Sequence, residues 1–111
     1  MRRGDVVVVA DRAGGDYAGK PRSALVVQSD AFGATQSLVV CPLTTREREA
    51  PLLRVAVSPS AALPLAAPCW VMVDKITSIR RERAREPAVG RVSDDELVAV
   101  NRSLAVFLGL G

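Results

Sequence analysis

Three side chains of this sequence, those of Arg22, Thr44 and Thr45, are suited to binding a phosphate or an oxyanion. Arg22 opens one apolar segment, and the two threonines close the next apolar segment. If both segments are strands of one small sheet, the cation and the hydroxyl pair meet at one edge of it. A guanidinium binds phosphate oxygens in a bidentate manner. The chain contains no histidine, so any chemistry here works without the commonest general base.

The strands that would position these residues are visible as short apolar runs. Residues 5–10, 24–28, 38–43 and 53–57 each predict a strand, and the first is expected to be buried on both faces. Residues 70–73 and 76–79 predict one strand, or two strands with a bend at Asp74. Residues 58–64 predict a helical turn bounded by prolines. Residues 11–22, with three glycines and alternating charge, predict a loop long enough to be functional.

A capping box predicts the C-terminal helix. Ser93 is the expected N-cap and Glu96 the expected N3 residue, and Gly109 marks the end of the helix. Apolar residues recur at helical spacing between them: Leu97, Val100, Leu104, Phe107 and Leu108. We expect this helix to cover the core. The fold class predicted is mainly β with α, a small and strongly bent sheet or partial barrel with helices packed outside.

Length and composition set the outer limits. The 111 residues, of which 49% are apolar, predict one domain spanning 1–111 with a modest core. No apolar run approaches the roughly 20 residues that a membrane span needs, and the first valine run is too short for a signal peptide. We therefore expect a cytoplasmic protein. Cys41 and Cys69 are expected to be buried, reduced thiols, and two cysteines without histidine give little support for a metal site or cofactor.

Positive charge is concentrated in one segment. The net charge is +3, and residues 75–91 hold six cations against Glu82 and Glu86. Two interpretations remain open for this segment. It either follows a phosphate backbone or forms a solvated, salt-bridged loop.

An ordered set of motifs resembles the MazF/PemK-type toxins of the CcdB/MazF structural family. The likeness runs nearly end to end through Arg3-Gly-Asp-Val6, Gly14-Gly-Asp-Tyr-Ala-Gly19, Arg22-Ser-Ala-Leu-Val-Val-Gln-Ser-Asp30, Val40-Cys-Pro-Leu-Thr-Thr45, Val73-Asp-Lys-Ile-Thr-Ser-Ile79, Gly90-Arg-Val92 and Ala99-Val-Asn-Arg-Ser-Leu-Ala-Val-Phe-Leu-Gly-Leu110. The resemblance implies an SH3-like partial barrel, a homodimer, and a toxin of a type II toxin–antitoxin system. It also implies metal-independent, sequence-selective cleavage of single-stranded RNA, with mRNA as the target, and inhibition by a cognate antitoxin.

The resemblance also assigns two catalytic roles to the pair. Arg22 matches the family arginine that is given acid–base work. Because an unperturbed arginine is a poor base, we expect it to act as charge stabiliser or acid; the alternative is a surface salt bridge to Asp16 or Asp30. Thr44 matches the catalytic threonine, whose hydroxyl hydrogen-bonds the scissile phosphate. The alternative is a strand-end threonine that bonds the backbone.

The third catalytic candidate is Asp74. It follows an apolar stretch, so partial desolvation would make it a better base, and it matches the aspartate that the PemK branch uses as base. That branch has an arginine two residues earlier, where this sequence has Met72. A structural carboxylate that caps residues 75–77 is the alternative.

The expected RNA contacts are spread over the loop and the basic segment. The loop at 14–22 is expected to grip RNA, with Tyr17 able to stack on a base. The RNA-binding residues predicted are Asp16, Tyr17, Lys20, Ser29, Thr45, Lys75, Arg80 and Arg81.

Two other functions share this fold or its surface. A DNA gyrase poison of the CcdB type depends on a tryptophan near the C-terminus, whereas the only tryptophan here is Trp70, inside a strand pattern. That observation argues against poisoning. A non-catalytic RNA-binding module is the third interpretation, and Arg22 and Thr44 in matching places argue against it.

Overall fold

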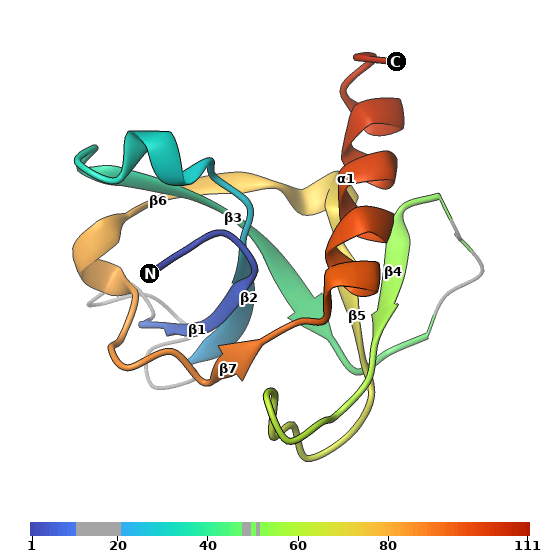
Figure 1. Cartoon of the computed structure of the whole chain (residues 1–111), viewed down its shortest axis with the longest axis horizontal. Helices are drawn as coiled ribbons and strands as arrows, with labels where there is room; N and C mark the ends of the chain where they lie inside the picture. The colour runs from blue at the N-terminus through green and yellow to red at the C-terminus, as the bar shows by residue number, and fades with distance from the viewer. Residues whose placement is uncertain (11–20, 48–49, 51) are drawn as a thin grey trace.

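The computed structural model of the chain describes residues 1–10, 21–47, 50 and 52–111, and within them one α-helix packs on an antiparallel, strongly bent sheet (Figure 1). The strands are β1 (Asp5–Val9), β2 (Arg22–Val26), β3 (Ser37–Thr44), β4 (Arg54–Val57), β5 (Cys69–Met72), β6 (Thr77–Arg80) and β7 (Gly90–Arg91). Three 3-10 turns, η1 (Asp30–Phe32), η2 (Val73–Lys75) and η3 (Arg81–Arg83), join strands, and α1 spans Asp94–Phe107. The strand order is β4-β5-β3-β2-β1-β7, with β6 also paired to β3. The predicted half-barrel of strands with one outer helix is confirmed.

The valine run of β1 forms a strand buried on both faces, as predicted. Val6 and Val7 point to opposite faces of the sheet, and both are fully buried. Val6 packs in a cluster with Leu25 and with α1, and Val7 packs in a second cluster with Val26 and the start of β3. The sheet therefore separates two apolar cores, and β-branched residues suit a strand that is covered on both sides.

Strand β3 is the centre of the sheet and changes partner along its length. One edge pairs with β2, while the other pairs first with β6, at residues 37–40, and then with β5, at residues 43 and 44. Pro42 lies in the gap between these two partners, a position that suits a residue without an N–H. The turn η2 joins β5 to β6 and contains Asp74, so the predicted bend between two strands is present.

Helix α1 begins at the predicted capping box. Ser93 Oγ accepts a hydrogen bond from the Glu96 N–H at 3.1 Å, and Glu96 Oε1 accepts one from the Ser93 N–H at 2.9 Å. Gly109 ends it with a positive φ of 72°. The prediction that the whole apolar stripe covers the core is wrong at its end. Val100 and Leu104 are buried, but Phe107 is 42% exposed, because the helix runs past the edge of the sheet (Figure 1).

Two further expectations need correction, and one strand was not predicted. Residues 58–64 form no helical turn; Ser60 and Leu63 instead exchange two backbone hydrogen bonds, of 2.9 and 3.1 Å, and Pro64 disfavours helical geometry in the residue before it. Cys69 is half-buried rather than buried, because it opens β5 at the end of the sheet. Strand β7 has only two residues, so the sequence shows no apolar pattern for it. Glycine is needed at position 90, because a Cβ there would lie 2.1 Å from the carbonyl oxygen of Ala62.

Within the described residues, no helix has both the length and the apolar character that crossing a membrane requires.

Candidate active site

Strands β2 and β3 bring Arg22 and Thr44 to the same level of the sheet. Ala24 pairs with Pro42, and the same antiparallel register, continued two residues toward these strand ends, sets Arg22 opposite Thr44. A groove of about 360 Å³ opens there, lined by Arg22, Ser23, Leu43, Thr44, Thr45, Arg46 and Cys69. The structure thus brings together the three residues with which the sequence analysis began.

The local sequence explains why Arg22 faces outward. It opens β2, follows Pro21, and is exposed, whereas Ala24 and Leu25 behind it are buried. The buried residues fix the strand, and the long side chain stays in solvent at its open end. The Arg22 side chain lines the groove, where its guanidinium can meet an anion.

Thr44 is the last residue of β3, and its hydroxyl has a defined partner. Thr44 Oγ1 accepts a hydrogen bond from the backbone N–H of Arg46 at 3.1 Å. The structural alternative for this threonine, a bond to the backbone at a strand end, is therefore present. It does not exclude the chemical role, because a hydroxyl that accepts one bond still has its own proton to donate.

Arg46 is a groove residue that sequence reasoning missed. It follows the threonine pair in a charged loop and is exposed. Among the described residues that line the groove, Arg22 and Arg46 are both cations, and none is a carboxylate. The described lining of the groove is therefore positive and suited to an anionic ligand.

The two cysteines are neutral thiols. Burial raises the pKa of Cys41 to about 12, with Arg3 opposing the rise and Asp74 adding to it. Burial also raises the pKa of Cys69 at the groove, whose Sγ donates to the Ala67 carbonyl oxygen at 3.4 Å. Since the thiolate is the nucleophilic form, neither thiol is prepared for attack at neutral pH.

Asp74 lies outside the groove and has another partner. Its carboxylate forms an ion pair with the guanidinium of Arg54 in β4, and the side chains of Arg54 and Asp74 are 8% and 27% exposed. Arg54 is also the cross-strand neighbour of Met72, which takes the place of the arginine found in the PemK branch. The alternative role for Asp74 was a cap of residues 75–77, and its partner in the structure is Arg54 instead. Sequence reasoning missed this pair, because an arginine at the start of a strand carries no signal of its partner.

Several cations of the basic segment have partners within the fold. The guanidinium of Arg81 donates to the carbonyl oxygen of Thr35 at 2.8 Å, and that of Arg83 donates to the carbonyl oxygen of Ala10 at 2.9 and 3.1 Å. Arg80 is exposed, and its Nη1 lies 3.6 Å from Glu82 Oε1. Only the contact between Arg80 and Glu82 corresponds to the salt-bridged interpretation, because Arg81 and Arg83 bind backbone carbonyl oxygens.

Arg80 and Arg81 lie far from the groove. Arg80 pairs with Ser37, at the opposite end of β3 from Thr44. Seven residues of extended strand span about 23 Å. A hollow of about 500 Å³ is present at that end, lined by Gln36, Ser37, Arg80, Arg81 and Glu82. One phosphate cannot reach both ends, so these arginines would contact a separate part of an extended ligand.

The remaining predicted contacts fall in different places. Lys75 is exposed on η2, and exposed Ser29 caps η1, with its Oγ accepting from the Ala31 N–H at 3.2 Å. Asp16, Tyr17 and Lys20 lie outside the described residues.

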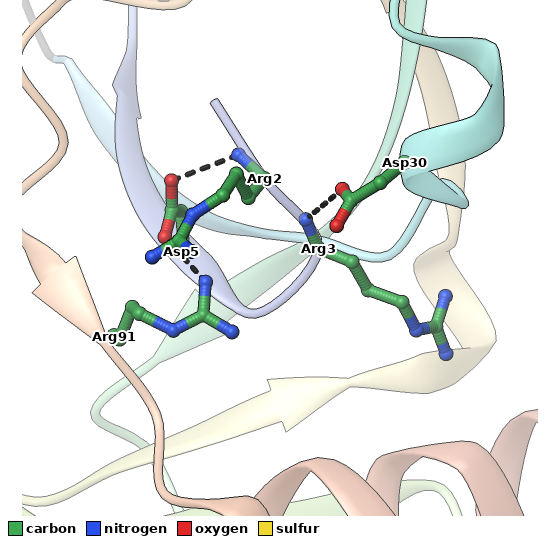
Figure 2. Close-up of polar contacts among 5 residues, drawn as sticks. All are labelled: Arg2, Arg3, Asp5, Asp30 and Arg91. Carbon is green, nitrogen blue, oxygen red and sulfur yellow. Dashed lines mark hydrogen bonds and ion pairs between the residues drawn. The ribbon is translucent and has the colours of Figure 1, made fainter.

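The N-terminal Arg-Gly-Asp motif joins the start of the chain to β7, to the segment after β2 and to α1 (Figure 2). The Arg3 N–H donates to Asp30 Oδ1 at 2.7 Å, which gives Asp30 a partner other than Arg22. The Arg3 guanidinium donates to the Val27 carbonyl oxygen and to Asn101 of α1. Asp5 accepts from the Arg2 N–H at 2.9 Å and from Arg91 Nη1 at 2.8 Å, so it joins the chain start to β7.

Across residues 1–10, 21–47, 50 and 52–111, no three Cys, Asp or Glu side chains gather as they would around a metal ion.

Comparisons with known proteins agree on one family. The family model described as "PemK-like, MazF-like toxin of type II toxin-antitoxin system" matches residues 2–108. A protein of Mycolicibacterium smegmatis described as "Probable endoribonuclease MazF" is 43% identical over 110 residues, which cover 99% of this chain and 98% of that protein. Two solved structures match nearly whole chains. An endoribonuclease in complex with its cognate antitoxin from a mycobacterial species has a TM-score of 0.76 at 25% identity, covering 100% of this chain and 97% of the other. A MazE–MazF structure from Deinococcus radiodurans has a TM-score of 0.78 at 27% identity, with 100% and 97% covered.

Proposed function

The chain belongs to the PemK-like, MazF-like toxin family of type II toxin–antitoxin systems, and we propose that it is an endoribonuclease that cleaves single-stranded RNA at the groove between β2 and β3. The observation that carries this proposal is the placement of Arg22 and Thr44 at one level of adjacent strands, in a groove whose described lining holds cations and no carboxylate. Residues 1–111 act as one toxin domain, and mRNA is the target.

The RNA and the groove supply the groups that the reaction needs, except for the base and water. The ribose 2′-oxygen attacks the adjacent phosphorus, and its proton passes to a base. The bond from phosphorus to the 5′-oxygen breaks as that oxygen takes a proton from water or from Arg22 acting as the acid. The products are a 2′,3′-cyclic phosphate and a 5′-hydroxyl. Arg22 stabilises the charge that develops on the phosphorane, and the Thr44 hydroxyl donates to one of its oxygens.

The candidate base, Asp74, does not line the groove. The family resemblance assigns this role to Asp74, whereas the structure gives Asp74 an ion pair with Arg54 and no place in the groove lining. A catalytic carboxylate must reach the 2′-hydroxyl directly or through one water. The two roles of Asp74 are separable by mutation, as described in the Discussion.

RNA binding extends beyond the scissile phosphate. Thr45 lines the groove beside Thr44, and Arg80, at the far end of β3, would hold a phosphate several nucleotides away. The other predicted RNA contacts are Asp16, Tyr17, Lys20, Ser29, Lys75 and Arg81.

The protein partners are a second copy of the chain and an antitoxin. Solved structures of relatives are described as containing an endoribonuclease with its cognate antitoxin, and MazE with MazF. Large apolar side chains are exposed at the end of α1, among them Val106, Phe107, Leu108 and Leu110, and we propose that a homodimer covers them. The working compartment is the cytoplasm, where mRNA is found.

Gyrase poisoning has no support in the structure. Trp70, the only tryptophan, is a half-buried residue of β5 paired with Thr44, and the C-terminal residues after α1 contain none. A non-catalytic RNA-binding module would not need Arg22 and the Thr44 hydroxyl at one level of the sheet.

An assay on a mixed RNA pool tests the proposal. Purified protein is incubated with the pool in excess EDTA, and the cut ends are sequenced and their termini analysed. We expect cuts at a short recurring motif that leave 2′,3′-cyclic phosphate and 5′-hydroxyl ends. RNA left intact by freshly purified, folded protein would contradict the proposal, and RNA that is retained but uncut would favour the binding module.

A further inference from the structure

We propose that Arg46 is a second phosphate-binding residue of the groove and that its backbone N–H positions the Thr44 hydroxyl as a donor. The proposal rests on the proposed RNA cleavage and adds a residue that neither the family resemblance nor the sequence pattern singles out. Arg46 stands two residues beyond Thr44, where β3 has just ended.

The orientation of the Thr44 hydroxyl supports the proposal. Thr44 Oγ1 accepts from the Arg46 N–H at 3.1 Å, and this bond occupies one of the two lone pairs of the hydroxyl oxygen. The amide hydrogen and the hydroxyl hydrogen repel each other, so the hydroxyl proton turns away from the loop. A threonine held in this way has its hydroxyl proton available to donate to a phosphate oxygen.

The negative charge that develops in the reaction also supports a second cation in the groove. The phosphorane formed by attack of the 2′-oxygen carries about two negative charges, and one guanidinium neutralises half of that. Arg46 lines the same groove as Arg22 and approaches it from the β3 side, whereas Arg22 comes from β2. Two arginines therefore line one groove from neighbouring strands, an arrangement suited to binding an anion there.

Arg46 differs in its position from other arginines of the surface. Arg81 and Arg83 donate to backbone carbonyl oxygens, and Arg91 pairs with Asp5. Their guanidiniums stabilise the fold. Arg46 is exposed and lines a groove, which is the position expected of a cation that binds a ligand.

The test compares Arg46→Ala and Arg46→Lys with Arg102→Ala, a control that removes an exposed arginine of α1 outside the proposed RNA contacts. Single-turnover cleavage of an RNA whose cut site is known (a mapped RNA) gives the rate of the chemical step. Fluorescence of Trp70, which is the cross-strand partner of Thr44 and the only tryptophan, reports binding of the same RNA carrying a 2′-O-methyl group at the cut site. Salt dependence of that binding counts phosphate contacts.

We expect Arg46→Ala to slow the chemical step by about tenfold or more and to reduce the salt slope by about 0.7, the value for one single-strand phosphate contact. Arg46→Lys should restore most of the slope and part of the rate, because a point charge replaces a planar fork. Arg102→Ala should leave both the salt slope and the single-turnover rate unchanged.

The backbone part has its own test. Arg46→Pro removes the side chain and the N–H together, so it should be slower than Arg46→Ala in wild type and no slower than Arg46→Ala in a Thr44→Val background. Circular dichroism of each variant checks the fold, and Arg46→Ala carries the first part of the proposal if the proline variant does not fold.

Wild-type rate and wild-type salt slope in Arg46→Ala, with RNA still cleaved by the parent protein, would overturn the inference and leave the proposed function intact. A parent protein that cleaves no RNA would contradict the proposed function instead. In that case the salt slope on the methylated RNA still decides whether Arg46 contacts a phosphate.

Discussion

Arg22 and Thr44 lie across from each other at the open ends of two adjacent antiparallel strands, and both line one groove. The backbone ladder between β2 and β3 sets their relative position, and the buried residues behind them, such as Ala24 and Leu25, hold the ladder. Substitutions at either position therefore remove a functional group and leave the core intact. This separation of site from core makes the following predictions interpretable.

The hydroxyl of Thr44 is expected to matter more than its methyl group. Thr44→Ser should keep most of the cleavage rate, because the hydroxyl can still accept from Arg46 and donate to phosphate. Thr44→Val, which keeps the shape, should cut about 10²-fold more slowly, as expected for loss of one preorganised donor. Single-turnover assays on one RNA measure both. Equal rates for the serine and valine variants would remove Thr44 from the mechanism.

Asp74 is tested by separating rate from stability. As the partner of a largely buried guanidinium, its loss in Asp74→Asn should lower the free energy of unfolding by about 2 kcal/mol, a value below that of a fully buried pair since Asp74 is partly exposed. Arg54→Met should show a similar loss in urea denaturation. If Asp74 is also the base, only Asp74→Asn will slow cleavage by orders of magnitude at a temperature where both variants are folded. Equal rates in the two variants would leave Asp74 with its structural role alone.

Cys41 predicts a loss of stability at alkaline pH. Its pKa is raised by burial from an ordinary value of 9.0 to about 12. Above pH 9 the unfolded chain loses the thiol proton while the folded chain keeps it, so stability falls as pH rises, by up to about 1.4 kcal/mol per pH unit until the folded thiol ionises. Urea midpoints at pH 8 and pH 10 should show a larger drop in wild type than in Cys41→Ala, which cannot titrate. Parallel pH profiles for the two proteins would mean that the thiol is not protected in the folded state.

The exposed end of α1 predicts a dimer. Sedimentation at micromolar concentration should give about 24 kDa, twice the 11.8 kDa of the chain. Phe107→Glu should shift the protein toward monomer, because a charge placed in an apolar contact is unfavourable. Arg102→Glu, on the same helix and also exposed, serves as the charge control. A wild-type monomer that cleaves RNA at full rate would contradict this assembly.

Local patterns predicted the elements, and long-range contacts escaped prediction. The valines of β1 and the Ser93–Glu96 capping box predict a strand and a helix start from a few neighbouring residues. The ends of two predicted strands were enough to predict that Arg22 lies beside Thr44. The Arg54–Asp74 pair joins β4 to η2, and Arg3 reaches Asn101 across nearly the whole chain. An arginine in a sequence does not name its acceptor, so such contacts have no local signal.

Arg46 was missed for a related reason. Its contribution depends on the backbone turn that follows Thr44, and the composition of the segment suggested only a charged loop. Phe107 shows the opposite error. Its spacing is that of a core residue, but the sheet ends before the helix does, and only the tertiary structure reveals where the covered surface stops.

The most direct measurement is the single-turnover cleavage rate of Arg22→Ala beside that of wild type, on one mapped RNA in excess EDTA. We expect a loss of about 10²–10³-fold with an unchanged fold and dimer, partial rescue by Arg22→Lys, and a smaller change in affinity for the methylated RNA. Cleavage by Arg22→Ala at the wild-type rate would place the active site elsewhere and contradict the account.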